Sequence, residues 1–109
     1  MAQITFHSHI DDIEKATAEQ LARAAEIIGM IAESYAKQSC PVDTGNLRNS
    51  ITHATEDEGR TVVIGSAVEY APYVELGTSR QKPQPYLRPA IENHIPEYQA
   101  VLQTILQGG

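Results

Sequence analysis

Cysteine, tryptophan and phenylalanine are scarce in this sequence. Tryptophan is absent, and cysteine and phenylalanine occur once each among 109 residues. The single cysteine, Cys40, excludes an intrachain disulfide, and the histidines are not spaced as its partners in a zinc site would be. His7 and His9 form the nearest approach to a metal-binding pair, but no third ligand stands beside them. We therefore predict a buried Cys40 and neither a metal ion nor another cofactor.

Long apolar runs are also missing. No run approaches the roughly 20 residues of a membrane-spanning helix, and the polar amino end is unlike a signal peptide. Apolar residues make up 41% and charged residues 20%, which is typical of a folded protein. The length predicts a single domain over residues 1–109. We expect no contact with a membrane and a protein that stays in the cytosol unless an assembly carries it out.

Basic residues are few and unevenly placed. Eight bases against fourteen acids give a formal net charge of −6, which argues against a protein that coats nucleic acid through phosphate contacts. Between Leu76 and Ala90, however, there are three bases and no acid, whereas residues 1–58 hold ten acids and four bases. This segment suits contact with an acidic surface on a neighbouring subunit. A solvated basic loop is the alternative.

Two parallel stripes of apolar and small residues predict a long helix over about residues 10–39. Its apolar stripe is Ile10, Ile13, Thr17, Leu21, Ala24, Ile28, Ile31 and Tyr35. Its small-residue stripe is Ala18, Ala22, Ala25, Gly29, Ala32 and Ala36. Spacings of three and four residues put each stripe on one helix face. Ser8 suits the start of this helix and Pro41 its end. Together the stripes predict two packing partners.

The polar side of the same helix is interrupted by Met30. A helix of this length spans roughly 43 Å, whereas a compact chain of this size has a diameter of about 34 Å. We therefore expect the helix to extend beyond its own globule and Met30 to contact another subunit. A flattened monomer, whose later segments lie along the whole helix, is the alternative.

The remainder of the chain predicts β structure, then a loop, then a second helix. A hairpin is expected at about 50–65, with "MAQITFHS" as a further strand, and a short helical turn at Ala71–Leu76 ends at Gly77. Prolines make Ser79–Pro85 an extended arm. Apolar spacing predicts a helix at about 88–106, which Pro96 should kink or divide.

The tripeptide Asp43-Thr44-Gly45 raises the question of an aspartic protease, in which each half of a dimer supplies one carboxylate. A protease loop would follow an apolar strand, whereas this tripeptide follows a helix that ends at Pro41. A cap of a short helical turn accounts for the same residues. We favour the cap and keep two alternatives: a dimeric aspartic protease and a small nucleic-acid-binding regulator.

Three segments carry a family resemblance. "PVDTGNLRNSI" (Pro41–Ile51), "VVIGSAVEYAPYVELGTSR" (Val62–Arg80) and "PQPYLRPAI" (Pro83–Ile91) resemble the head–tail joining proteins of tailed bacteriophages, also called neck, tail-completion or minor tail proteins. The resemblance implies an α+β fold, with a long helix packed on a small antiparallel sheet, a short central helical turn and a C-terminal helix. It also implies a structural virion protein without enzymatic activity.

The resemblance further implies assembly. Subunits would form a ring, which we expect to be hexameric, at the head–tail junction or tail end, assembled in the cytoplasm of the bacterial host. Its partners would be copies of itself and neighbouring head-connector or tail proteins, with DNA only passing through and no small-molecule substrate. We interpret Tyr70, Tyr73 and Leu87 as packing residues. The candidates for contacts with subunits or partners are Met30, Arg48, Glu75, Arg80, Lys82, Tyr86 and Arg88. For Arg48, Glu75 and Arg88, the charge suggests polar links either within or between subunits.

Overall fold

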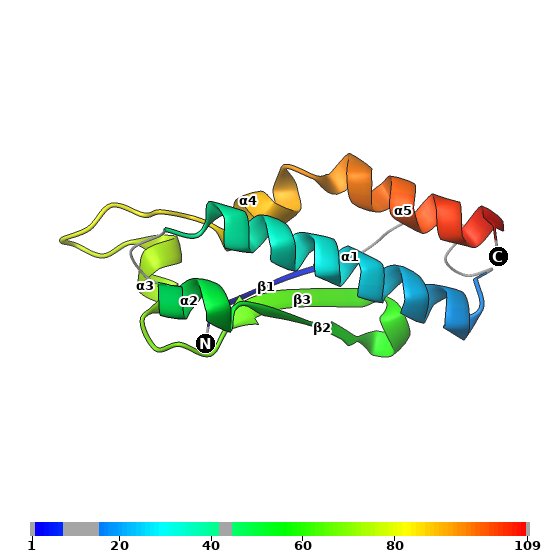
Figure 1. The fold of residues 1–109 in the computed structure, drawn as a ribbon, viewed down its shortest axis with the longest axis horizontal. Coiled ribbons are helices and arrows are strands. Elements are labelled where there is room, and N and C mark those ends of the chain that lie inside the picture. The colour runs from blue at the N-terminus through cyan, green and yellow to red at the C-terminus, as the bar shows by residue number, and fades with distance from the viewer. Residues whose placement is uncertain (1, 8–15, 42–44, 109) are drawn as a thin grey trace.

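Helices lie along one side of a small antiparallel sheet (Figure 1). The computed structural model describes residues 2–7, 16–41 and 45–108. The elements in chain order are β1 (Ala2–His7), α1 (Ala18–Ser39), α2 (Gly45–Ser50), β2 (Thr52–Glu56), the 3-10 turn η2 (Asp57–Gly59), β3 (Thr61–Ser66), α3 (Ala71–Leu76), α4 (Leu87–Glu92) and α5 (Ile95–Gly108). This architecture confirms the predicted α+β class.

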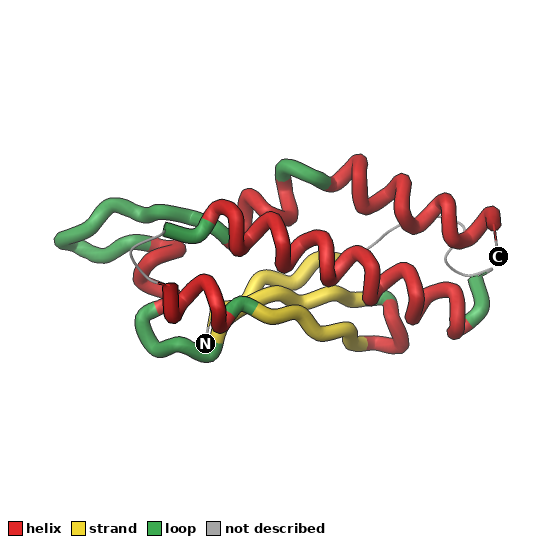
Figure 2. Tube along the Cα trace, viewed as in Figure 1, coloured by secondary structure: helices red, strands yellow, loops and turns green. Residues whose placement is uncertain are grey.

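The sheet has three strands in the order β1-β3-β2, and both pairs are antiparallel (Figure 2). The opening strand therefore pairs as the sequence suggested, with Ala2 opposite Ser66 and His7 opposite Thr61. All of β3 is buried, and as the central strand it has both backbone edges paired. Val62 and Ile64 point from this strand into the core shared with the helices.

Helix α1 begins at Ala18, later than the sequence predicted. Thr17 has an extended backbone, its hydroxyl accepts the Gln20 amide, and the Gln20 side chain accepts the Thr17 amide. This capping box satisfies two amides that a helix start leaves unpaired, so it fixes the boundary. The predicted turns over residues 10–15 and the Ser8 cap lie outside the described residues.

The expected overhang of this helix is wrong. Its 22 residues span roughly 33 Å at 1.5 Å per residue, whereas the molecule measures 48 × 21 × 19 Å. The molecule is elongated rather than flattened, but later segments do lie along the helix as in the alternative, because the sheet and α5 run beside α1 while the arm extends past its end (Figure 1).

The two predicted packing partners of α1 are both present. The small-residue stripe faces the sheet, since the ring of His53 on β2 lies against Gly29. The apolar stripe faces α5, since the Tyr35 hydroxyl donates to the carboxylate of Glu97 at 2.7 and 2.8 Å. The Tyr35 ring also stacks on His94, with 3.6 Å between the ring centroids.

The predicted C-terminal helix is divided in two. α4 ends at Glu92 and α5 begins at Ile95, so Pro96 falls in the first turn of a new helix, where its missing amide costs nothing. The two parts stay joined, because the hydroxyl of Tyr98 donates to the carbonyl of Ala90 at 2.5 Å. Across the described ranges, no helix has both the length and the apolar character to cross a membrane.

Candidate functional site

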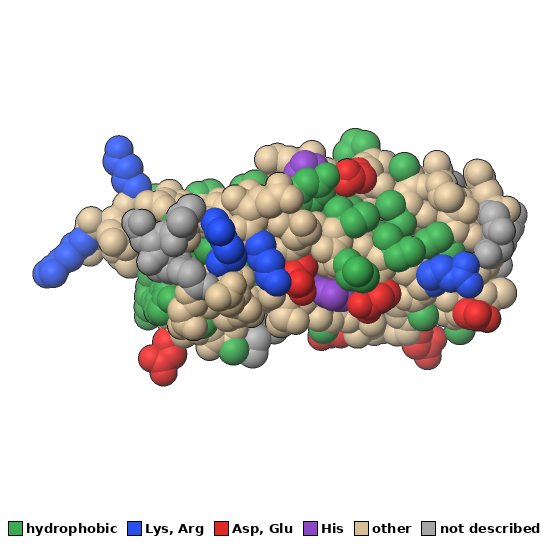
Figure 3. Space-filling view, viewed as in Figure 1, with side chains coloured by type: hydrophobic (Ala, Val, Ile, Leu, Met, Phe, Trp, Pro, Cys, Tyr) green, Lys and Arg blue, Asp and Glu red, His purple; other side chains and the backbone are tan. Residues whose placement is uncertain are grey.

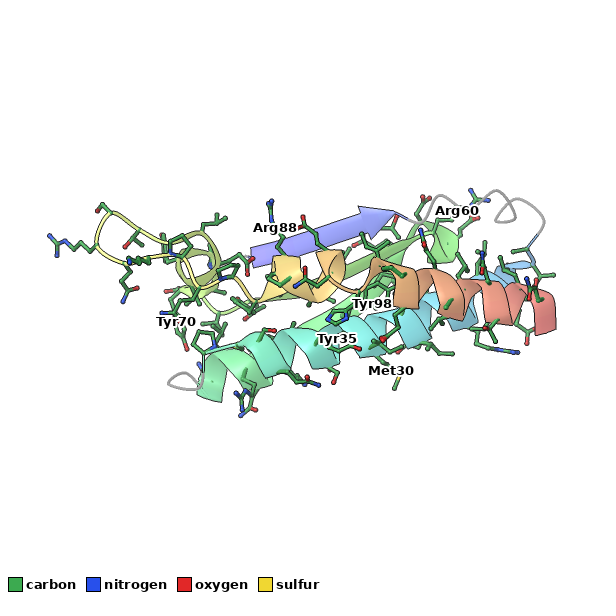
Figure 4. The ribbon with its side chains drawn as sticks, turned by 90° about the horizontal axis from the view of Figure 1, so that it is seen from above. Met30, Tyr35, Arg60, Tyr70, Arg88 and Tyr98 are labelled. Carbon is green, nitrogen blue, oxygen red and sulfur yellow. The ribbon has the colours of Figure 1, made fainter. Side chains whose placement is uncertain are left out.

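The outer face of α1 exposes apolar side chains. Met30 is 58% exposed and Ile27 is exposed beside it. Figure 3 shows hydrophobic atoms gathered over the middle of the face formed by α1 and α5, and in Figure 4 Met30 points away from the sheet into solvent. Met30 is therefore available to a partner, as the sequence predicted.

A shallow open groove runs beside Met30. Its volume is about 490 Å³, and it is lined by Met30, Glu33, Ser34, Lys37, Gln38 and Arg48. Arg48 comes from α2, and its Nη2 atom donates to the carbonyl of Cys40 at 3.5 Å, which holds α2 against the end of α1. The structure thus brings together two residues, Met30 and Arg48, that the sequence had singled out separately. Cys40 itself is buried, as predicted.

Glu75 is an internal anchor: of the two kinds of polar link expected for it, the structure shows the one within the subunit, and its burial removes it from the partner contacts. Its side chain is buried, and one carboxylate oxygen accepts the amides of Tyr86 and Leu87 at 2.9 and 2.8 Å. The other oxygen accepts the amide of Arg88 at 3.2 Å. A negative charge on the unpaired amides of a helix start is favourable. Glu75 therefore ties α3 to the beginning of α4.

Tyr86 is also internal, so the expectation that it contacts a partner is corrected. Its side chain is fully buried in the main core. The hydroxyl has no hydrogen-bond partner within the described part of the chain. Burial, together with the nearby Cys40 and Glu75, raises the pKa of this phenol well above its usual value. Leu87, in contrast, packs in the core as predicted.

The proline-rich segment forms a closed loop that projects from one end of the molecule (Figure 1). At its base the Gln84 amide donates to the carbonyl of Val74 at 2.8 Å, and Gly77 has a φ of 78° and lies against Pro83. A side chain on residue 77 would meet that proline ring, so glycine is required there. The loop presents the side chains of Arg80 and Lys82 to solvent.

Helix α3 exposes a second apolar surface. Tyr73 is 58% exposed and Leu76 is 69% exposed, and Tyr70 and Glu69 are exposed next to them. Tyr70 and Tyr73 therefore do not pack in the core of this chain, and packing against a partner stays a prediction. A six-residue helix buries only one side, and here that side carries Ala71 and Glu75.

Arg88 lies apart from these surfaces. It projects from α4 on the side of the molecule opposite Met30 (Figure 4). Its guanidinium is 4.0 Å from Glu92, one turn along the helix, and both side chains are well exposed. Such a pair adds little to stability, so Arg88 remains open to other contacts.

Sequence reasoning missed a charged cluster that joins β2 to α1. His53 Nε2 is 2.8 Å from Glu26 and Nδ1 is 2.9 Å from Glu33, which also pairs with Lys37 at 3.2 Å. Burial disfavours the imidazolium, but the two carboxylates outweigh it and raise the pKa of His53. Burial likewise acts against the Glu33 charge, and its bonds to His53 and Lys37 nevertheless lower the Glu33 pKa. The sequence feature that could have indicated this cluster was Gly29, a glycine in the middle of a helix between the two glutamates.

The described residues contain no group of three or more histidine, cysteine or acidic residues that could hold a metal ion. Asp43 and Thr44 of the candidate protease motif lie outside the described residues, and Gly45 begins α2. The cap interpretation of this motif and the protease alternative both stay predictions.

A comparison with known protein families finds a match to a bacteriophage family. The family model described as "Bacteriophage HK97-gp10, putative tail-component" matches residues 5–77. The match begins within β1, covers α1, α2, β2, β3 and α3, and ends at Gly77, before the projecting loop. No curated protein and no solved structure matches the chain.

Proposed function

Because the chain belongs to the HK97-gp10-like family of bacteriophage tail components, we propose that it is a structural protein of a tailed phage or prophage that joins the head to the tail or completes the tail end. The family match over residues 5–77 carries the proposal. The exposed apolar surfaces support it, because contiguous apolar surface marks sites of protein association. The protein then acts in the virion after assembly in the host cytoplasm.

The proposed assembly is a ring of identical subunits, with six as the expected number. A ring is built from unlike surfaces on each subunit that meet in a head-to-tail manner and close. The chain offers unlike surfaces, since α1 and α3 expose apolar residues at different places. A net charge of −6 suits a ring through which DNA passes without adhering.

Contacts beyond the ring are assigned to the projecting loop and to Arg88. Arg80 and Lys82 extend from the end of the molecule on a loop closed at its base. Two basic side chains on such a loop fit an acidic surface of a neighbouring head-connector or tail protein, because complementary charge guides association.

The proposal is tested in particles. Protein identification in purified virions should find several copies per particle, and removal of the gene should leave heads and tails unjoined. Light scattering of the purified protein should give a ring, or a monomer that assembles only with its partner. Complete infectious particles formed without the protein would contradict the proposal.

The same purified protein can be used to test the two alternative functions. A tight dimer that cleaves peptides, and loses cleavage in Asp43→Asn, would favour the aspartic protease. Affinity for duplex DNA that falls steeply with salt would favour the nucleic-acid-binding regulator.

A further inference from the structure

Helix α3 presents an apolar surface with acidic character, here called the α3 surface and made of Glu69, Tyr70, Tyr73 and Leu76. Leu76 and Tyr73 are 69% and 58% exposed, among the most exposed large hydrophobic residues described. No lysine or arginine occurs between residues 61 and 79. Glu69 forms no salt bridge with any residue that the structure describes. The surface therefore suits a partner that is apolar and basic.

The groove beside α1, here called the α1 groove, has that character. Met30 supplies the exposed apolar side chain, and Lys37 and Arg48 supply two bases against the single acid Glu33. Glu33 pairs with Lys37 at 3.2 Å and with His53, so the guanidinium of Arg48 supplies the net positive charge of the groove lining. Tyrosine, methionine and arginine are the residue types enriched in protein interfaces, and the two surfaces together contain all three.

Charge decides which surfaces pair. If two copies met through their α1 grooves, Lys37 and Arg48 would face the same bases, and two α3 surfaces would bring Glu69 against itself. Like charges across an interface are costly. The unlike pair instead sets Glu69 against Lys37 and Arg48 and covers both apolar parts at once. The α3 surface cannot turn onto its own groove, because Glu75 and Gly77 fix α3 to its own α4 and loop.

We infer that the α3 surface of one copy docks in the α1 groove of the next, with Tyr73 and Leu76 against Met30 and with Glu69 near Lys37 and Arg48. The inference rests on the proposed ring and identifies its subunit contact. Such a contact uses different surfaces on the two copies, which is the type that closes into rings.

Disulfide trapping tests the contact. The variants Met30→Cys and Tyr73→Cys are made separately and in one chain, then oxidised as purified protein and in particles from phage-producing cells. Mixing the two single variants should yield a crosslinked dimer, and the double variant should yield a ladder that ends at the ring number. The unchanged chain is the control, because its only cysteine, Cys40, is buried.

The outcomes separate this inference from the proposed function. Crosslinking of Met30→Cys with itself, or a ring that forms without any mixed crosslink, overturns the docking and leaves the ring proposal intact. Absence of any oligomer, both in solution and in particles, overturns both.

A charge-reversal variant tests the docking independently of the crosslinks. Glu69→Lys should weaken subunit association roughly tenfold or more, because it sets a base against Lys37 and Arg48. Adding Arg48→Glu to the same chain should restore part of the loss. Glu56→Lys is the matched control, since Glu56 is also exposed but lies on β2 in neither surface. Equal weakening by Glu69→Lys and Glu56→Lys overturns the docking. Circular dichroism confirms that each variant is folded.

Discussion

At the scale of single residues, His53 connects the sheet to the long helix. Its imidazole bonds two carboxylates on α1, so both ring nitrogens donate and the ring carries a positive charge. Gly29 makes this possible, because a side chain there would occupy the space of the ring. Glycine lowers the intrinsic helix propensity at this position, but its lack of a side chain allows the charged link between α1 and β2.

The cluster makes stability depend on pH in a predictable direction. The raised pKa of His53 means that its contribution is complete below the unfolded value near 6.5 and is lost as pH rises through the folded value. The lowered pKa of Glu33 means that its contribution is present above about 4.5 and is lost in acid. Urea unfolding at pH 5.5 should therefore show a larger gap between wild type and His53→Gln than unfolding at pH 8.5. An equal gap at both pH values would show that the charge on His53 contributes nothing.

Gly29→Ala should destabilise the protein, although alanine is the better helix former by about 1 kcal/mol. The new methyl group would push the His53 ring off its carboxylates, and overpacking of this kind costs roughly 1–3 kcal/mol. In a His53→Ala background the same substitution should instead stabilise the helix. Thermal unfolding of the four proteins measures this reversal of sign. Destabilisation in both backgrounds would mean that another neighbour, not the imidazole, limits residue 29.

At the scale of elements, the Glu75 carboxylate holds α3, the loop and α4 together. Glu75→Ala should cost about 1–3 kcal/mol, because three buried or part-buried amides lose their acceptor. Denaturant unfolding measures the loss, and trypsin should cut sooner after Arg80, which precedes Gln81. Glu69→Ala is the matched control, since Glu69 is exposed on the adjoining turn. A loop that stays resistant to trypsin in Glu75→Ala would contradict the anchoring role.

Local sequence signals predicted most elements but not their ends. Periodicity located α1. Turn residues and a β-branched run located the β2–β3 hairpin, and Gly77 marked the end of the short helix. The start of α1 was misplaced, because the apolar stripe continues through Thr17 while the capping box with Gln20 ends the helix there. That error of about two turns, together with the assumption of a compact chain about 34 Å across, made the helix seem longer than the molecule, whose long axis is 48 Å.

The candidate site was harder to predict because it depends on which elements become neighbours. Exposure of Met30 followed from its position on the polar helix face. Nothing in the sequence indicated that Arg48 lines the same groove, or that Tyr86 and Glu75 turn inward. A glutamate bound to backbone amides leaves no pattern of charged partners to read. The motif positions therefore indicated important residues, but they did not distinguish residues that hold the subunit together internally from residues that are exposed on its surface.

At the scale of the whole molecule, the chain is a rod with unlike ends. The basic loop and α3 lie at one end, and the start of α1 and the carboxyl end of α5 form the other, with the turn η2 toward it (Figure 1). The rod is held along its length by α1, which contacts the sheet and α5. Such polarity gives each copy a defined direction, so identical copies arranged in the proposed ring would all present their basic loops on the same side.

That arrangement makes the basic loop the part of the ring that reaches the next component. Replacement of Arg80 and Lys82 by serine should leave the fold and the ring unchanged, because both side chains are exposed and outside the core. Joining of heads to tails should fall, because the charges that meet the acidic partner are gone.

Deletion of Ser79–Gln84 should block joining altogether, while the Glu75 anchor keeps α3 against α4. Counting joined and separate particles by electron microscopy measures the effect. The matched control is Arg60→Ser, which removes an exposed base far from the loop. Normal yields of infectious particles from the deletion would show that the loop has no part in joining, whatever the state of the ring.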